Sequence, residues 1–381
     1  MNKVFLRYFI SGYLNRFNAN QLVYSEISSA KRKSIRTLQV YLELPDKYVP
    51  LLNILAPVLP ICDMVISLVR VFFKFILCVI RLIPSHHQSI PSGYFFVQLN
   101  MLPGKVNNMN KVVPEIEKTY LEIPFIKNQM TGGVNILPYL NVVDLWESML
   151  LSVRTIIFLY WKYSKNYQMF RAHSSFEFYL TCMFVRKTPN DRSFVFYSLI
   201  DRWAYLFAND SKHSNILIQH GILGDVPFIK MKAPHKVYYV NKEQKQILDK
   251  RLFRIPPMES LYRPMLQFSG DEKLLKNDRE DILLVCCPKF IEQERSIIDS
   301  ICKTNRYNLY VKTHPGFSNN DIYDELQSKY GFILLDKYDY PKVDFVISYN
   351  STLAIEYMDV GMVVYKYDDA DFNRKFNQLL K

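Results

Sequence analysis

Glycine is scarce in this sequence, with 11 residues among 381, and the six cysteines form no CxxC pair. A chain with so little glycine and with 49% hydrophobic residues is neither disordered nor fibrous. Cysteines scattered without metal-ligand spacing predict reduced thiols and argue against a structural zinc site. The length allows two domains, each with its own hydrophobic core. The composition therefore predicts a folded two-domain protein without a bound metal.

A secretory signal is not recognisable either. Residues 1–20 carry Lys3, Arg7 and Arg16 among aromatic residues, without a clean apolar core or a small-residue cleavage site. We therefore expect the protein in the cytoplasm or on the cytoplasmic face of the inner membrane. The formal net charge of +12 indicates an anionic partner. Because nucleic-acid-binding motifs are missing and the chain is very apolar, that partner is expected to be a lipid surface or an anionic substrate, not a nucleic acid.

The most hydrophobic part of the sequence is the segment 51–83. Prolines and charged residues interrupt it, which disfavours a spanning helix. On a helix, Arg70, Lys74 and Arg81 would fall roughly along one stripe opposite Val, Phe, Ile and Leu side chains. This pattern is typical of a helix that lies in the membrane interface with its basic edge toward anionic headgroups. Peripheral or monotopic attachment of this segment is therefore favoured, and a spanning helix or a buried core helix is the alternative. A second apolar segment, 143–163, is expected to form a core helix or a second membrane-facing helix.

From about residue 190, short apolar strands alternate with helices. The first series has strands at 193–199, 215–219 and 236–240 and a helix at 242–253. The second series follows a proline-rich and polar link at 254–279; its strands are expected at 281–286, 307–312, 332–335, 345–348 and 362–365, and its helices at 292–302, 320–329 and 352–358. Such alternation predicts parallel βαβ units. We therefore expect an α/β protein with Rossmann-like domains at 1–260 and 280–381.

Lys312, His314 and Pro315 follow the strand predicted at 307–312, in the segment KTHPG. Open parallel sheets bind ligands at the carboxyl ends of their strands. There His314 can donate a hydrogen bond to a phosphate oxygen, and Lys312 adds positive charge. A turn that happens to contain His and Pro is the alternative.

A second motif, SYNSTLAIE, runs from Ser348 to Glu356. A strand ends at Ser348, and Ser351 and Thr352 stand at the expected start of a helix, whose free N–H groups and positive dipole end attract phosphate. Glu356 follows one turn later, where it can accept hydrogen bonds from ribose hydroxyls. Ordinary helix capping is the alternative. Together the two motifs predict one donor nucleotide site that comprises Lys312, His314, Pro315, Ser348, Ser351, Thr352 and Glu356.

In the first domain, the segment QHGILGD follows the strand predicted at 215–219. Gly221 and Gly224 allow a close backbone approach to a ligand. His220 or Asp225 can deprotonate an acceptor hydroxyl, and we expect both to be catalytic, with a structural histidine as the alternative for His220. The sequence has no DxD pattern in a suitable loop, which predicts a metal-independent reaction.

The strand–KxHP motif, followed after the next strands by SxxSTxxxE, resembles the C-terminal domain of GT-B glycosyltransferases that use cytidine nucleotides. These include bacterial sialyl- and polysialyltransferases, Kdo transferases of capsule synthesis, and CDP-glycerol glycerophosphotransferases. The QHG segment resembles one found in surface-polysaccharide transferases, so that the resemblance covers roughly residues 190–381. It implies a GT-B fold, with two Rossmann-like domains facing across a cleft, and contacts of His314, Ser351 and Thr352 with the donor phosphates.

The resemblance further implies a bacterial glycosyltransferase of capsule, O-antigen or lipooligosaccharide synthesis. It would transfer a sugar from a CMP- or CDP-activated donor to a glycan or lipid-linked glycan acceptor at an anionic membrane surface, without a cofactor. Three alternatives remain open: a polyol-phosphate transferase of teichoic-acid type, a GT-B epimerase or hydrolase acting on a UDP-sugar, and a non-catalytic membrane scaffold of a polysaccharide assembly complex. The N-terminal 190 residues match no pattern, and acceptor recognition is expected there.

Overall fold

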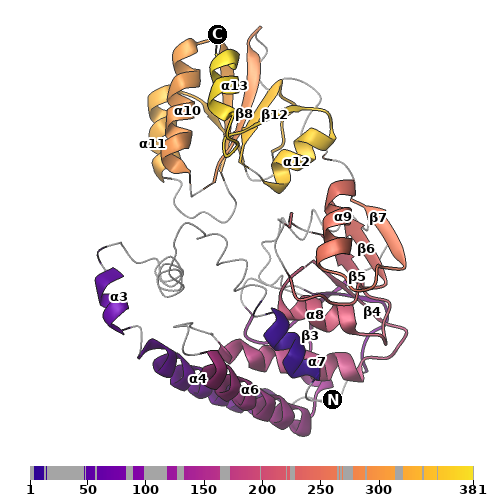
Figure 1. The fold of residues 1–381 in the computed structure, drawn as a ribbon. Coiled ribbons are helices and arrows are strands. Elements are labelled where there is room, and N and C mark those ends of the chain that lie inside the picture. Colours follow the sequence, from indigo (N-terminus) through magenta and orange to yellow (C-terminus); the bar gives the residue numbers. More distant parts are fainter. Residues whose placement is uncertain are drawn as a thin grey trace. The chain divides into compact units, whose positions relative to one another are not determined.

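A computed structural model of the protein describes residues 4–12, 14, 47, 49–55, 58–82, 89–97, 118–126, 133–163, 172–197, 199–219, 221–223, 228–263, 266, 268, 278–287, 290–313, 321–336, 339–349 and 351–380. The chain divides into two compact units, Met1–Arg263 and Pro264–Lys381. Each unit contains one sheet, and all the strand pairs in both sheets are parallel (Figure 1). The expected α/β class is therefore confirmed.

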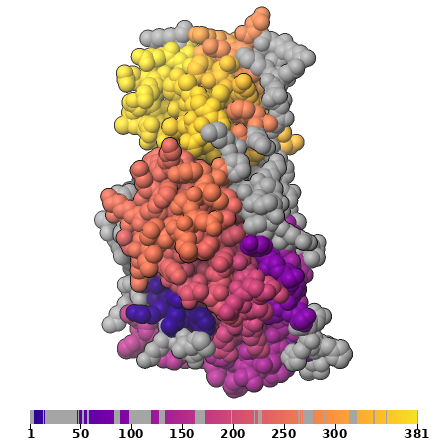
Figure 2. All heavy atoms as spheres, turned by 90° about the vertical axis from the view of Figure 1, so that its right-hand side faces the viewer, coloured from indigo at the N-terminus to yellow at the C-terminus, as the bar shows by residue number. Residues whose placement is uncertain are grey.

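The sheet of the first unit has seven strands in the order β3-β2-β1-β4-β5-β6-β7. The strands are Tyr94–Val97 (β1), Lys118–Glu122 (β2), Val134–Asn135 (β3), Ser193–Phe196 (β4), Ile216–Ile218 (β5), Lys236–Tyr239 (β6) and Glu259–Tyr262 (β7). After β3 the chain returns to place β4 on the other side of β1, which is the strand order of a doubly wound sheet. The edge strand β7 has four exposed residues, and it lies on the face of the molecule that Figure 2 shows.

Six described helices of the first unit share one hydrophobic core on one face of this sheet. They are a helix over residues 4–12 and the helices Leu59–Leu82 (α4), Val142–Tyr163 (α6), Ser175–Lys187 (α7), Arg202–Asn209 (α8) and Lys242–Arg251 (α9). The helix Val49–Leu55 (α3) contributes no described residue to this core. Helix α7 is buried from Ser175 to Val185; most of its side chains there are apolar, and the buried carboxylate of Glu177 is paired with Lys74. Helix α6 packs against α7, and α4 packs against α6.

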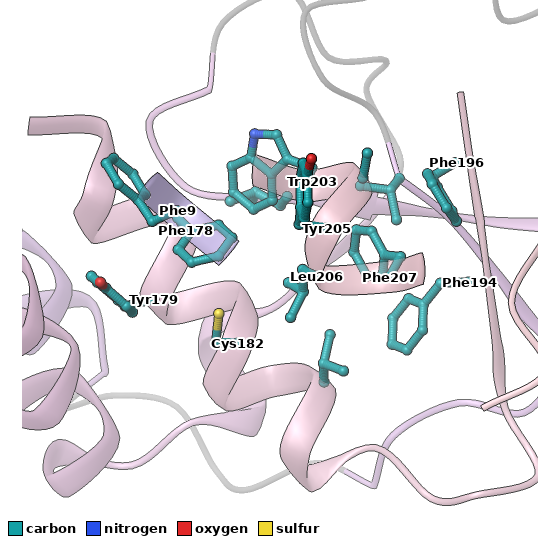
Figure 3. Packing of buried hydrophobic residues seen from close by; sticks show 14 of the residues in the cluster. Phe9, Phe178, Tyr179, Cys182, Phe194, Phe196, Trp203, Tyr205, Leu206 and Phe207 are labelled. Carbon is teal, nitrogen blue, oxygen red and sulfur yellow. The ribbon is translucent and has the colours of Figure 1, made fainter. Parts of the chain in front are cut away.

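Aromatic side chains fill the space between α7, α8 and the sheet (Figure 3). Phe178 of α7 makes edge-to-face contacts with Phe9 of the N-terminal helix and with Trp203 of α8. The N-terminal helix lies so close to α8 that a Cβ atom on Gly12 would be 2.0 Å from the backbone nitrogen of Arg202. Glycine at this position therefore permits the contact that docks the helix.

The sheet of the second unit has five strands in the order β10-β9-β8-β11-β12. The strands are Glu280–Val285 (β8), Tyr307–Lys312 (β9), Ile333–Leu334 (β10), Phe345–Ser348 (β11) and Val363–Lys366 (β12); the helices are Ile291–Thr304 (α10), Asp321–Tyr330 (α11), Thr352–Asp359 (α12) and Phe372–Leu379 (α13). Side chains of α10, α11 and α13 form a core on one face of the sheet, and those of α12 form a core on the other face. This unit is thus also doubly wound.

Most elements predicted beyond residue 190 are present, with bounds that differ by a few residues. The strands β9 and β11 have the predicted bounds. Strands β1, β2, β3 and β7 and helix α13 were not predicted, and the first three show that the N-terminal 190 residues supply part of the first sheet. No described helix is both long enough and apolar enough to cross a membrane.

The prediction that Lys74 of the segment 51–83 faces anionic headgroups is wrong. Its ammonium group is 2.5 Å from a carboxylate oxygen of Glu177 on α7, and the Lys74 side chain is only 12% exposed. Lys74 therefore lies on the side of α4 that faces the protein. An ion pair with a buried partner holds it there, because a buried carboxylate needs a compensating charge.

Candidate functional site

The carboxyl edge of the second sheet contains the predicted donor-site residues that the structure describes. The chain runs from β8 through α10 to β9 on one side, and β11 lies on the other side of β8. This reversal creates a topological switch point between the ends of β8 and β11, which is where open parallel sheets bind ligands. Ser348 ends β11 at this point and is fully buried.

Two serine hydroxyls close the turn from β11 into α12. Ser351 is the N-cap of α12, and its Oγ accepts a hydrogen bond from the backbone N–H of Ala354 at 3.0 Å. The Oγ atoms of Ser348 and Ser351 are 3.1 Å apart. The first N–H groups of a helix have no intrahelical acceptor. Within the described part of the chain, those of Thr352 and Leu353 have no other acceptor, so they are available to an anion.

Helix α10 begins on the other side of the switch point, but its N-terminus is less suited to an anion. Its N-cap residue, Phe290, makes no side-chain capping bond, and its first turn carries Glu292 and Glu294. Carboxylates repel phosphate, whereas the first turn of α12 contains no acidic residue. A phosphate at the switch point is therefore favoured at α12.

Glu294 is a buried carboxylate that sequence analysis did not single out. Its Oε1 accepts hydrogen bonds of 2.6 Å from the backbone N–H of Cys287 and from the Tyr367 hydroxyl, and its Oε2 accepts one from the Tyr323 hydroxyl. Burial raises the pKa of Glu294, and the hydrogen bonds act in the opposite direction. The bonds connect the loop after β8 to α10, to α11 and to the segment after β12. Glu294 therefore fixes the backbone that borders the switch point.

Lys312, predicted as a phosphate ligand, ends β9 and directs its ammonium group toward the loop between β10 and β11. Its Nζ donates hydrogen bonds to the carbonyl oxygens of Asp336 at 2.9 Å and Asp339 at 2.7 Å, and it lies 4.5 Å from the centroid of the Tyr340 ring. Burial lowers the pKa of Lys312 to about 8, and the two aspartates act in the opposite direction. In this arrangement Lys312 organises a loop at the edge of the sheet.

The remaining predicted donor-site residues divide into two groups. Thr352 and Glu356 are half-buried in α12, and their spacing puts them on one face of the helix. His314 and Pro315 lie outside the described residues. Another basic residue does lie at this edge, because β12 ends at Lys366, whose Cα is paired with that of Ser348. Sequence analysis did not predict Lys366 as a site residue, because the pattern of a strand does not show which strand lies next to it.

In the first unit, two buried glutamines hold the start of the QHG segment. Gln219 donates from Nε2 to the carbonyl oxygen of Gly221 and to Oε1 of Gln244, both at 2.9 Å, and its Oε1 accepts from the backbone N–H of Val240 at 3.0 Å. Oε1 of Gln244 also accepts from the backbone N–H of Leu223 at 2.9 Å. The backbone at 219, 221 and 223 is thus attached to β6 and α9.

His220, Gly224 and Asp225 lie outside the described residues, so their predicted roles remain predictions. Gly221 has no positive φ, and a Cβ atom added to it would meet nothing within 4 Å. Glycine at 221 is therefore not required by its backbone conformation or by neighbouring protein atoms. The open space beside it is compatible with the approach of a ligand.

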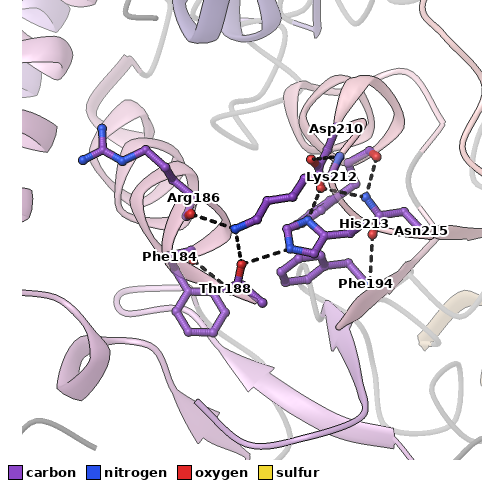
Figure 4. Close-up of polar contacts among 9 residues, drawn as sticks. Phe184, Arg186, Thr188, Phe194, Asp210, Lys212, His213 and Asn215 are labelled. Carbon is purple, nitrogen blue, oxygen red and sulfur yellow. Dashed lines mark hydrogen bonds and ion pairs between the residues drawn. The ribbon is translucent and has the colours of Figure 1, made fainter. Parts of the chain in front are cut away.

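His213 and Asp210 of the first unit resemble a catalytic His–Asp pair, but their role is structural. Nδ1 of His213 contacts a carboxylate oxygen of Asp210, and its Nε2 lies 3.3 Å from the carbonyl oxygen of Thr188 (Figure 4). Asn215 belongs to the same network: its Oδ1 accepts a hydrogen bond from the backbone N–H of Phe194, and its Nδ2 donates to a carboxylate oxygen of Asp210. In the described part of the chain, no group of His, Cys, Asp and Glu side chains could hold a metal ion.

Comparison with known protein families finds no match, and comparison with curated proteins finds none either. Among solved structures, the chain is similar to a variant of the wall teichoic acid polymerase TagF with CDPG, at 10% identity and a TM-score of 0.39 over 81% of this chain and 80% of that one. It is also similar to TarM, at 12% identity and a TM-score of 0.29 over 50% of this chain and 48% of that one. At these scores the likeness decides neither fold nor function.

Proposed function

We propose that the protein is a glycosyltransferase of GT-B type that acts in cell-surface polymer synthesis and takes its transferred group from a cytidine nucleotide. In this proposal the second unit binds the donor and the first unit binds the glycan or lipid-linked acceptor. The observation that carries the proposal is the N-terminus of α12, which lies at the switch point of a doubly wound sheet, with the Ser351 cap and without an acidic residue in its first turn.

The donor phosphates would accept hydrogen bonds from the N–H groups of Thr352 and Leu353, the Thr352 hydroxyl and His314. Ser348 and Ser351 would hold the turn in the conformation that presents these donors. Lys312 and Lys366 would contribute positive charge at the same edge of the sheet, which favours an anionic ligand.

Catalysis would depend on the QHG segment. A general base must be held within hydrogen-bond reach of the hydroxyl that it deprotonates. The hydrogen bonds of Gln219 and Gln244 attach the chain on both sides of position 220, at residues 219, 221 and 223. We propose His220 as the base or as a ligand of the leaving phosphate, and Asp225 as a second acid-base group. The reaction is proposed to need no metal.

Isothermal titration of the purified chain with CMP, CDP, UMP and UDP tests the donor class. We expect CMP or CDP to bind and the uridine nucleotides to bind at least tenfold more weakly. His314→Ala should weaken binding, whereas His235→Ala, the same change at a partly exposed position of the first unit, should not. Absence of binding by every cytidine nucleotide contradicts the proposal, and selective binding of UDP favours the epimerase or hydrolase.

Transfer itself is measured as release of cytidine nucleotide from CMP-sugars and from CDP-activated sugars or polyols in the presence of lipid-linked acceptor and EDTA. The donor that supports release distinguishes sugar transfer from polyol-phosphate transfer. His220→Ala should lower turnover at least a hundredfold and leave nucleotide binding intact, as expected for a group that acts on the acceptor. Binding without turnover of any of these donors supports the non-catalytic scaffold.

A further inference from the structure

Helices α4 and α6 together expose a large apolar surface. They lie side by side (Figure 1). On α4 this surface includes Val69, Phe72 and Phe73, and on α6 it includes Trp146 and Trp161. Phe73 is 60% exposed and Trp161 is 77% exposed. We call this surface the α4–α6 face.

The two helices contribute to one continuous surface and not to two separate patches. Trp146 of α6 makes an edge-to-face contact with Phe75 of α4, with the ring centroids 5.6 Å apart. Fourteen large apolar side chains on the two helices are exposed, which leaves roughly 1,000 Å² of apolar surface when about half of each is in contact with solvent. The largest apolar patch of a soluble monomer is roughly 300–600 Å² and is often functional.

The opposite side of each helix packs against the core and carries polar residues among its apolar ones. Asp63 and Ser67 of α4 are buried, and Lys74 of α4 forms its ion pair with Glu177 there. Ser152 and Thr155 are the buried counterparts on α6. A helix of a soluble protein normally turns its apolar side to the core and its polar side to water. The core-facing side of α6 already buries Leu145, Met149 and Leu159, so the outer apolar side chains are additional to those that the core takes up. This indicates that the α4–α6 face meets an apolar medium other than the core of this protein.

The charges on these helices favour an anionic surface. Arg70 and Arg81 of α4 and Arg154 of α6 are exposed. Of the acidic residues, Asp63 and Asp144 are buried. The third, Glu147, is paired with Arg186 at 3.5 Å. The exposed charges of the two helices are therefore arginines, apart from Glu147 in its ion pair and Lys162, and Arg70 and Arg81 lie beside the apolar side chains of α4, on the stripe that they share with Lys74.

These charges argue against a second copy of the chain as the occupant. A twofold interface would bring the same patch of each copy together, and the arginines would then repel each other. A bilayer with anionic phospholipid satisfies both features at once, since acyl chains take up the apolar side chains and headgroups pair with the arginines. The indole rings of Trp146 and Trp161 are suited to the boundary between headgroups and acyl chains.

We propose that the α4–α6 face lies in the interface of an anionic phospholipid bilayer, with both helices parallel to its plane. Lys74 takes no part in lipid binding, because it holds α4 against α7 from the protein side. This inference does not depend on the donor class or on the reaction proposed above.

Flotation of the full chain with vesicles tests the proposal. We expect binding to vesicles of phosphatidylcholine and phosphatidylglycerol in equal parts, and at least tenfold weaker binding to phosphatidylcholine alone. The double variant Phe72→Glu, Phe73→Glu should reduce the bound fraction at least tenfold. The matched control is Met258→Glu, which places the same charge at a residue that is 81% exposed outside the face; it should bind as the wild type does.

A second measurement places the helix at the bilayer. Cys62 of α4 is exposed and Cys302 is half-buried, so a polarity-sensitive dye can be attached to Cys62 in a Cys302→Ser background. Its emission should shift to the blue when the mixed vesicles are added. Arg70→Glu combined with Arg81→Glu should remove the preference for anionic vesicles.

Three results would overturn the proposal. One is a wild-type chain that remains unbound with both kinds of vesicle and shows no shift of dye emission. Another is a correctly folded Phe72→Glu, Phe73→Glu variant that binds vesicles as the wild type does. The third is a wild-type chain that does not bind vesicles but forms a dimer, which the two substitutions dissociate. That result would assign the α4–α6 face to contact between copies of the chain. Nucleotide titration of the same variants keeps this test separate from the proposed function, since CMP or CDP affinity should not change.

Discussion

Replacing Ser351 by Asp should separate the two roles of the α12 N-terminus. Asp and Asn are N-caps as good as Ser, so either can accept the bond from Ala354 that Ser351 accepts now. They have nearly the same shape, and any packing cost at this buried position is therefore shared. They differ in charge: without ligand, the helix dipole favours the carboxylate and burial disfavours it, and an anion bound beside the cap would repel it. Ser351→Asn is thus the matched control for Ser351→Asp.

The expected magnitude follows from the geometry of the turn. A carboxylate about 5 Å from a phosphate, at an effective dielectric constant of about 20, is repelled by about 3 kcal/mol for each unit charge. This corresponds to roughly a hundredfold loss of affinity. The stability of the chain without ligand should differ by less than about 0.5 kcal/mol between the two variants, whereas Ser351→Ala should cost about 1 kcal/mol because the cap is lost.

Calorimetric melting with and without CMP or CDP measures both quantities. Nucleotide at 100 times its dissociation constant stabilises the wild type by about 2.7 kcal/mol, and after a hundredfold loss of affinity the same concentration provides about 0.4 kcal/mol. We therefore expect the nucleotide-induced rise in Tm to persist in Ser351→Asn and almost to disappear in Ser351→Asp.

Equal nucleotide-induced shifts in the Asn and Asp variants would refute the phosphate site at α12, because a full negative charge would then have no effect. A large loss of stability in both variants without ligand would refute the capping argument instead. Addition of salt should narrow the difference between the two variants only slightly, since salt screens a partly buried charge pair much less than an exposed one.

Three further predictions concern stability. Glu294→Gln should lower the free energy of unfolding by about 2–4 kcal/mol in urea titrations, because the new amide group must face hydroxyl and N–H donors in a buried site; an unchanged midpoint contradicts the network. The folded-state pKa of Lys312 is lowered to about 8 from 10.5, so the charged form is disfavoured in the folded protein and stability should rise by up to about 3 kcal/mol between pH 8 and 10.5. In Lys312→Met this slope should be absent, and equal slopes would show that Lys312 is not responsible. Gly12→Ala should lower the free energy of unfolding by about 1–3 kcal/mol in thermal melts, because the new Cβ atom would overlap the backbone of Arg202. Gly221→Ala is the control: its Cβ atom would meet nothing within 4 Å, so it should lower that free energy by less than about 0.5 kcal/mol.

Local patterns in the sequence were sufficient to predict the second sheet and the turn from β11 into α12. Strand β11 is four apolar or small residues, and a cap and a helix follow after two further residues, so the sequence alone places Ser348 at the strand end and Ser351 at the N-cap. These features depend on neighbours in the chain, which is why spacing could reveal them. The short strands β1 and β3 could not be predicted in the same way, because they are isolated from the regular alternation of strands and helices.

The direction of a side chain, by contrast, was decided only by tertiary packing. Spacing correctly put Lys74 on one side of a helix but could not tell which side faces the protein, since a partner 103 residues away, Glu177, determines it. The same holds for Lys312, whose ammonium group meets carbonyls of a later loop, and for Glu294, whose donors come from α11 and the segment after β12. A sequence pattern specifies the face that a residue shares with its neighbours, whereas contacts between distant segments specify what that face meets.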